Sequence, residues 1–217
     1  MATLTTGTKT YTVQYGDGEL ELKVPAGNIR AEIQMTDFPA VQHLPRAIID
    51  RLEDPIGCAP LAEQVKAGDQ VAIMTGDRIT DQMLGARDGI GFVLLDHLNG
   101  LGVPDEDITL VYAGGMHANA LVREHLGEEL MARVRTIVHD PDDEDRLTYC
   151  GMTPRGTSVW INSVVAEADF KLGIGEISPT VHAGWCGGGK IMLPGVAGRL
   201  SIEQNHAMVL WPNSSFL

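Results

Sequence analysis

The stretch QVAIMTGDRITDQMLGARDGIGFVLLDHLNGLGVPDEDITLVYAGGMH, residues 70–117, contains two strand patterns separated by a helical one. Residues 70–74 form a short apolar run, and residues 108–112 form a second. Between them, residues 81–99 repeat their apolar side chains at the spacing of an amphipathic helix. This alternation predicts an α/β fold whose sheet is mostly parallel or mixed, with helices on both faces.

The rest of the chain follows a compatible order. Residues 10–24 alternate apolar and polar side chains about Gly16-Asp17-Gly18, which predicts an N-terminal β-hairpin. Further helices are expected over residues 43–53, 59–66 and 119–133, and further strands over residues 134–138, 158–164 and 168–174. The acidic run at residues 140–145 is expected to be a solvated loop. We therefore expect residues 1–217 to form a single α/β domain.

Composition limits the partners of this chain. Its 217 residues can bury a substantial core, and its formal net charge of −13 argues against nucleic acid or an anionic membrane as a partner. No stretch approaches the length of a membrane span, and the N-terminus does not resemble a signal peptide. Three widely separated cysteines do not form a disulfide framework. An acidic cytoplasmic enzyme is the expected class.

Polar side chains follow the predicted strands at their carboxyl ends. Asp77 comes after residues 70–74, His117 comes after residues 108–112, and a glycine-rich segment, residues 177–190, follows the strand predicted at 168–174. Ligands of parallel sheets bind at this edge. Three separate segments are therefore expected to meet in one crevice.

The glycine-rich segment continues as ISPTVHAGWCGGGKIMLPGVAGRLSIEQNH, residues 177–206. Gly184 through Gly189 and Lys190 satisfy most of the phosphate-binding loop pattern of nucleotide hydrolases. That loop needs a serine or threonine after the lysine to hold magnesium, and here Ile191 follows instead. Hydrolysis of ATP or GTP is therefore not expected.

The same segment, together with Asp77 and Gly115-Met116-His117, resembles the N-terminal domain of the nickel-dependent lactate racemase family. The most specific part runs from Ala183 to Lys190 and on to Asn205-His206. Members of this family carry a nickel-pincer nucleotide (nickel pyridinium-3,5-bisthiocarboxylic acid mononucleotide) bound covalently to a lysine. They are about twice as long as this chain, so the resemblance implies a second domain or subunit that completes the site.

The resemblance assigns roles to residues where the motifs match. It implies that Lys190, beside Gly187, Gly188 and Gly189, binds the cofactor, and that His206 is the nickel ligand. It also implies that His117 exchanges the substrate proton and that Asp77 belongs to the active site.

This chain departs from the family at three positions that concern the substrate. Thr180 stands where the family has a second proton-transfer histidine, and we expect His182 to substitute for it. Thr80 stands where an arginine grips the substrate carboxylate, and Ala118 replaces another arginine. These departures argue against lactate itself as the substrate.

The proposed residue types suit the chemistry. No side chain accepts a hydride well, so racemisation at a hydroxyl-bearing carbon requires a cofactor, while histidine suits the transfer of the hydroxyl proton. Imidazole also suits nickel, and soft sulfur donors of the cofactor would complete the coordination. The sequence thus predicts a racemase or epimerase of an α-hydroxy acid or a related hydroxyl-bearing substrate.

Each residue also has a structural interpretation. Composition alone would make Lys190 a solvated loop residue, Asp77 a turn or helix cap, and Cys186 a filler of a small-residue position. We expect the remaining four histidines to be structural or surface residues: His43, His97, His125 and His139. The alternative function is a non-catalytic or degenerate domain of the same fold that binds a nucleotide or a carboxylate.

Overall fold

The computed structural model describes residues 7–34, 36–76, 79, 81–117, 122–180 and 183–211. The chain divides into two compact units, Met1–Ala40 and Val41–Leu217. Within the described residues, no helix is long and apolar enough to cross a membrane.

The first unit contains the predicted hairpin. Strand β1 (Thr8–Tyr15) pairs antiparallel with β2 (Gly18–Pro25), and Tyr15 lies opposite Gly18. Gly16 has a φ of 60°, which suits the first central position of a two-residue hairpin turn. The unit continues into a short 3-10 helix, η1 (Ala26–Asn28).

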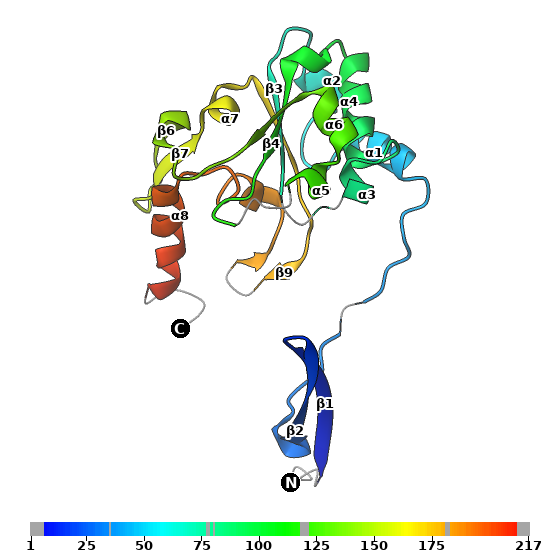
Figure 1. Cartoon of the computed structure of the whole chain (residues 1–217), viewed down its shortest axis with the longest axis vertical. Coiled ribbons are helices and arrows are strands. Elements are labelled where there is room, and N and C mark those ends of the chain that lie inside the picture. The colour runs from blue at the N-terminus through cyan, green and yellow to red at the C-terminus, as the bar shows by residue number, and fades with distance from the viewer. Residues whose placement is uncertain are drawn as a thin grey trace. The chain divides into compact units, whose positions relative to one another are not determined.

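The second unit is built on a four-stranded parallel sheet (Figure 1). The strand order is β5-β4-β3-β8. Their bounds are β3 (Val71–Thr75), β4 (Ile108–Tyr112), β5 (Arg135–Val138) and β8 (Phe170–Ile174). The predicted α/β class and the N-terminal hairpin are therefore confirmed, and the sheet that carries the helices is entirely parallel.

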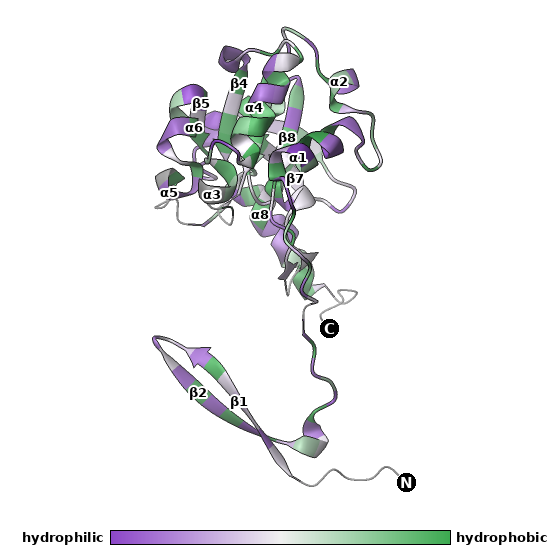
Figure 2. Ribbon diagram, turned by 90° about the vertical axis from the view of Figure 1, so that its right-hand side faces the viewer, coloured by the Kyte–Doolittle hydropathy of each residue, from purple (hydrophilic) through white to green (hydrophobic). Residues whose placement is uncertain are grey.

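Helices from the first part of this unit cover one face of the sheet. Val71 and Ile73 of β3 point to this face, where they pack against α4, whose residues are largely hydrophobic (Figure 2). The helices on this side are α1 (Leu44–Glu53), α2 (Leu61–Gln64), α3 (Asp81–Leu84), α4 (Ile90–Gly100), α5 (Val122–Leu126) and α6 (Glu128–Arg133). The short 3-10 helix η2 (Asp105–Asp107) leads into β4.

The alternate side chains of β3, Ala72 and Met74, point to the opposite face. There they pack with Val165 and Ile202, which come from α7 and α8. The elements on this side are β6 (Leu147–Met152), β7 (Ser158–Asn162), α7 (Ser163–Glu167) and α8 (Arg199–His206). Shorter elements complete this half of the chain: η3 (Glu144–Arg146), β9 (Pro179–Thr180), β10 (Gly184–Trp185), η4 (Gly188–Ile191) and η5 (Ala207–Leu210).

Two predicted helices are wrong in extent because glycines interrupt them. The helix predicted over residues 81–99 is split into α3 and α4 by a turn in which the Gly89 N–H donates to the Ala86 carbonyl at 2.8 Å. A Cβ atom at Gly89 would lie 2.8 Å from the Met83 carbonyl oxygen, so this turn requires glycine. The helix predicted over residues 119–133 is split at Gly127, whose φ is 75°.

The strand predicted over residues 158–164 also differs. Its first part is β7, which pairs antiparallel with β6 outside the parallel sheet, and its last residues begin α7. Strand β6 was not predicted from the sequence. Alternating side chains do not reveal which neighbour a strand pairs with, because that choice depends on tertiary contacts.

His139 links the end of β5 to the segment that leads into α8 through a hydrogen bond to Ala197. This side chain is fully buried, and its Nε2–H donates to the Ala197 carbonyl at 2.9 Å, while Nδ1 faces Asn162 Nδ2 at 3.4 Å. Burial lowers the pKa of His139 below its ordinary value of 6.5, although the bond to Ala197 opposes this shift. The interpretation of His139 as a structural residue is consistent with this packing.

Stability is therefore expected to fall at mildly acidic pH. The unfolded chain binds a proton at His139 more tightly than the native protein does, so the free energy of unfolding decreases as the pH falls below about 6.5. Urea unfolding of the wild type and of His139→Gln, each from pH 5 to pH 8, measures this dependence. We expect a smaller decrease in the variant, and equal slopes would contradict the role of His139.

Candidate functional site

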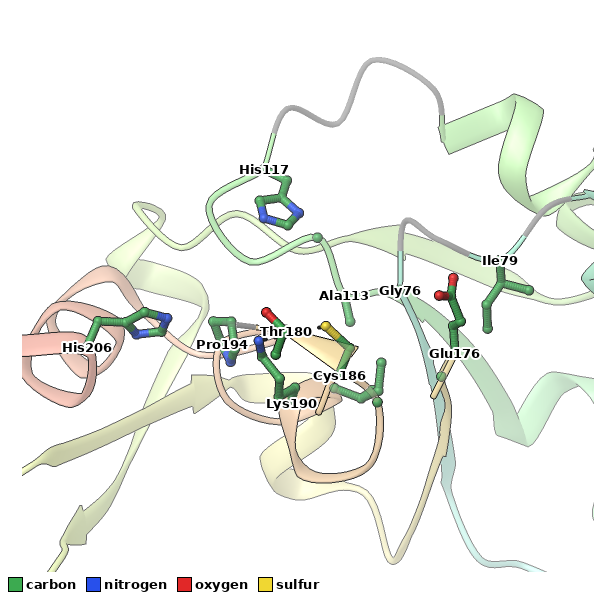
Figure 3. Close-up of a pocket in the computed structure, with 15 residues that line it drawn as sticks. Gly76, Ile79, Ala113, His117, Glu176, Thr180, Cys186, Lys190, Pro194 and His206 are labelled. Carbon is green, nitrogen blue, oxygen red and sulfur yellow. Dashed lines mark hydrogen bonds between the residues drawn. The ribbon is translucent and has the colours of Figure 1, made fainter. Parts of the chain in front are cut away.

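The carboxyl ends of β3, β4 and β8 open into one cavity of about 290 Å³ (Figure 3). Its described lining residues are Gly76, Ile79, Ala113, Gly114, His117, Gly175, Glu176, Thr180, Cys186, Gly187, Lys190, Ile191, Pro194, Gly195 and His206. They follow the three strands or belong to the glycine-rich segment and α8. The predicted meeting of three segments in one crevice is therefore confirmed.

Ile191 anchors the glycine-rich segment to the ends of the strands. A Cβ atom at Gly76 or Gly173 would lie 3.4 Å from the Ile191 side chain, and one at Gly175 would lie 3.1 Å from it. The strand ends lack side chains at these positions, so Ile191 packs directly on their backbone. The residue that breaks the nucleotide-loop pattern thus holds the preceding residue, Lys190, against the sheet.

Two further glycines let the backbone of this segment pack closely. Gly187 has a φ of 77°, and a Cβ atom there would lie 2.5 Å from the Glu176 carbonyl oxygen. A Cβ atom at Gly195 would overlap the Ile191 carbonyl oxygen. The Gly195 N–H donates to the Lys190 carbonyl, and its own carbonyl accepts from Gly115 N–H, both at 2.9 Å. The loops that carry Lys190 and His117 are therefore joined through Gly195.

Lys190 lies in the short 3-10 helix η4 and is half-buried. Its Nζ lies 4.0 Å from the Sγ of Cys186, and both side chains point to the same part of the cavity (Figure 3). Gly187 lines the cavity, whereas Gly188 and Gly189 form the turn that leads to Lys190. A primary amine directed into a cavity is positioned to react with a ligand there.

His206 is the last residue of α8, and its ring reaches the cavity. Its Nδ1 lies 2.9 Å from the Ile202 carbonyl oxygen. Because a carbonyl oxygen only accepts hydrogen bonds, Nδ1 is the donor in this contact, and in the neutral ring Nε2 then has a lone pair. Histidines that bind metals commonly have this arrangement. Within the described ranges, His, Cys, Asp and Glu side chains form no group of three that could hold a metal ion.

His117 lies in the turn after β4, where its N–H donates to the Gly114 carbonyl at 3.0 Å. Its ring borders the cavity on the side of the β4 loop (Figure 3). A separate contact links the hydroxyl of Tyr112, at the end of β4, to Nδ1 of His125 at 2.7 Å, and that ring is outside the cavity lining. Out of the residues predicted for the site, the structure thus brings together His117, Gly187, Lys190 and His206.

Two residues that line the cavity, Thr180 and Glu176, were not predicted as site residues. Thr180, at the position where a second histidine was expected from the family pattern, is partly buried in β9 and borders the cavity. Glu176 was not predicted. It follows β8 after a single glycine, so the rule that selected Asp77 and His117 from the ends of other strands would also have selected it.

Several predicted residues lie outside the described part of the chain. Asp77 and His182 belong to this group, and so do two positions where the family pattern is broken, Thr80 and Ala118. Their predicted roles remain predictions.

Comparison with known proteins identifies relatives for almost the entire chain. A model of the lactate racemase N-terminal domain matches residues 15–216. Lactate racemase from Thermoanaerobacterium thermosaccharolyticum is 27% identical over 206 residues, which cover 89% of this chain and 46% of that protein. Lactate racemase from Lactiplantibacillus plantarum is 30% identical over 159 residues, which cover 72% of this chain and 37% of that protein.

Solved structures support the same comparison. The lactate racemase apoprotein from Thermoanaerobacterium thermosaccharolyticum superposes with a TM-score of 0.72 and 25% identity, over 95% of this chain and 48% of that one. A protein from Thermotoga maritima shares the fold, with a TM-score of 0.56 and 21% identity. The chain spans less than half the length of the curated relatives it matches.

Proposed function

Because the chain belongs to the family of lactate racemase N-terminal domains, we propose that it carries the cofactor-binding half of a racemase or epimerase. The substrate is an α-hydroxy acid or a related hydroxyl-bearing molecule. The observation that carries this proposal is the meeting of Lys190, His117 and His206 around one cavity at the carboxyl edge of a parallel sheet.

Two features of the described residues support a nickel-pincer nucleotide as the cofactor. The amine of Lys190 is directed into the cavity and can form the covalent link. In the neutral ring of His206, Nε2 has a lone pair available for nickel. The described residues form no group of three His, Cys, Asp or Glu side chains that could hold a metal ion by itself, which suits a cofactor that brings its own donors. When bound, the nickel-pincer nucleotide supplies the acceptor for the hydride that leaves the substrate carbon.

The chain's own residues then handle binding and proton transfer. His117 takes the proton of the substrate hydroxyl when one enantiomer is converted to the flat ketone, and it gives a proton back when that enantiomer forms. The packing of Ile191 and the hydrogen bonds of Gly195 hold the Lys190 loop and the His117 loop in fixed positions relative to each other. A second domain or subunit closes the cavity, because the relatives are more than twice as long as the matched region.

One observation favours the alternative of a non-catalytic binding domain. Thr180 lines the cavity where the family has its second proton-transfer histidine, and a threonine hydroxyl does not serve as a general base at neutral pH. The two functions are distinguished by activity. Protein produced together with the enzymes of cofactor synthesis is incubated with single enantiomers of several 2-hydroxy acids, and chiral chromatography measures the opposite enantiomer. We expect it to appear, and its absence from protein that carries nickel would favour the binding domain.

His117→Ala is expected to reduce turnover by about 10²–10⁴-fold while the nickel content stays unchanged, because the substitution removes a proton-transfer group and no metal ligand. Turnover and nickel content are measured on the same preparations. His97→Ala, on α4 and outside the cavity lining, is the control and should match the wild type. Normal turnover of His117→Ala would remove this residue from proton transfer.

A further inference from the structure

Glu176 is the only carboxylate among the cavity-lining residues that the structure describes. It is an exposed residue that lines the same cavity as His117 and Lys190 (Figure 3). It comes from the end of β8, whereas His117 comes from the end of β4, and β3 lies between these two strands. The two groups therefore approach the cavity from different sides of the central strand.

Close packing of the backbone holds Glu176 in this place. Its carbonyl oxygen faces Gly187, where a Cβ atom would lie only 2.5 Å away. The preceding residue, Gly175, packs against the Ile191 side chain and the Gly187 backbone. The backbone of Glu176 is thus packed between the end of the sheet and the lysine loop, next to the turn that carries Lys190.

The proposed function requires two proton-transfer groups. A racemase starts from either enantiomer, so the substrate hydroxyl lies on one side of the site for one enantiomer and on the other side for its mirror image. A proton acceptor is needed on each side. His117 supplies one, and Thr180 cannot supply the other because its hydroxyl is too weak a base.

We propose that Glu176 is the second acid–base residue of this site, an inference that rests on the proposed function. For one enantiomer, the substrate O–H and C–H bonds break as the C=O bond forms. The proton moves to a Glu176 carboxylate oxygen, and the hydride would go to the acceptor that the proposed cofactor supplies. When the opposite enantiomer forms, protonated His117 gives its proton to the substrate oxygen. In the reverse direction, His117 takes the proton and Glu176 returns one.

This assignment predicts that Glu176→Gln and His117→Ala lose activity toward opposite enantiomers. In a single turnover of loaded protein, each enantiomer of the best 2-hydroxy acid is converted to the keto acid, which is trapped and quantified. Glu176→Gln should lose keto acid formation from one enantiomer by at least about a hundredfold and keep it from the other, and His117→Ala should show the opposite preference. Both variants should lose racemisation in both directions, because racemisation uses both groups.

A second measurement does not depend on turnover. Protein labelled with ¹³C at the glutamate carboxyl carbons is titrated with glycolate, the smallest α-hydroxy acid, with and without the cofactor. The resonances of Glu176 and of the control Glu167, at the end of α7, are assigned by their loss in Glu176→Gln and Glu167→Gln. We expect a saturable shift of the Glu176 resonance alone. No shift, or equal shifts of both resonances, would overturn the proposal.

Other outcomes separate this inference from the proposed function. If the wild type racemises and Glu176→Gln keeps keto acid formation from both enantiomers, the role of Glu176 is wrong and the racemase stands. If His182→Asn instead shows the enantiomer-specific loss, His182 is the second group. If the wild type carries no cofactor and forms no keto acid, the proposed function fails, while the glycolate titration still decides whether Glu176 faces a hydroxy acid.

Discussion

Lys190→Ala is expected to abolish both the covalent cofactor and turnover while the protein stays folded. The amine is the group that forms the link, so without it intact-mass spectrometry should detect only the mass of the unmodified chain. The fold should survive because Lys190 is only half-buried and because the neighbouring Ile191 makes the packing contacts with the strand ends. Turnover should fall below detection, since the cofactor performs the step that no side chain can.

Lys171→Ala is the matched control for this experiment. Lys171 lies on β8, and its ammonium group donates to the Ala168 carbonyl at 2.5 Å, away from the cavity lining. This variant should retain the adduct and the activity. An adduct that persists in Lys190→Ala and disappears in Lys171→Ala would show that the cofactor is attached to Lys171 instead.

His206→Ala is expected to lose nickel at least about tenfold while the adduct on Lys190 remains. The covalent link and the protein-side ligand belong to different elements, η4 and α8, so they should fail separately. Intact mass measures the adduct and elemental analysis measures nickel on the same preparation.

Glu203→Gln, on the same helix and outside the cavity lining, is the control for His206→Ala. It should keep the nickel content of the wild type. Full nickel content in His206→Ala would show that another group is the ligand and would leave only the amine link in place.

Much of the arrangement around the site followed from local sequence patterns. The runs at residues 70–74 and 108–112 correspond to β3 and β4 with at most one residue of difference at each end, because short apolar segments in a parallel sheet are buried on both faces. The meeting of three loops followed from the rule that parallel strands present their carboxyl ends at one edge.

Tertiary packing determined the features that the sequence did not reveal. The glycine that splits α3 from α4 lies in a helical pattern that looks continuous, and only the nearby carbonyl of Met83 shows why a side chain cannot fit there. The contact of Ile191 with Gly76 joins residues more than a hundred positions apart, so no local pattern predicts it.

The most direct test of the account is peptide mapping by tandem mass spectrometry of protein produced together with the enzymes of cofactor synthesis. We predict a single modified peptide, the one that contains Gly187-Gly188-Gly189-Lys190, with the added mass on the lysine side chain and nickel in the intact protein. An unmodified Lys190 in protein made under conditions that load a known lactate racemase would contradict the central claim.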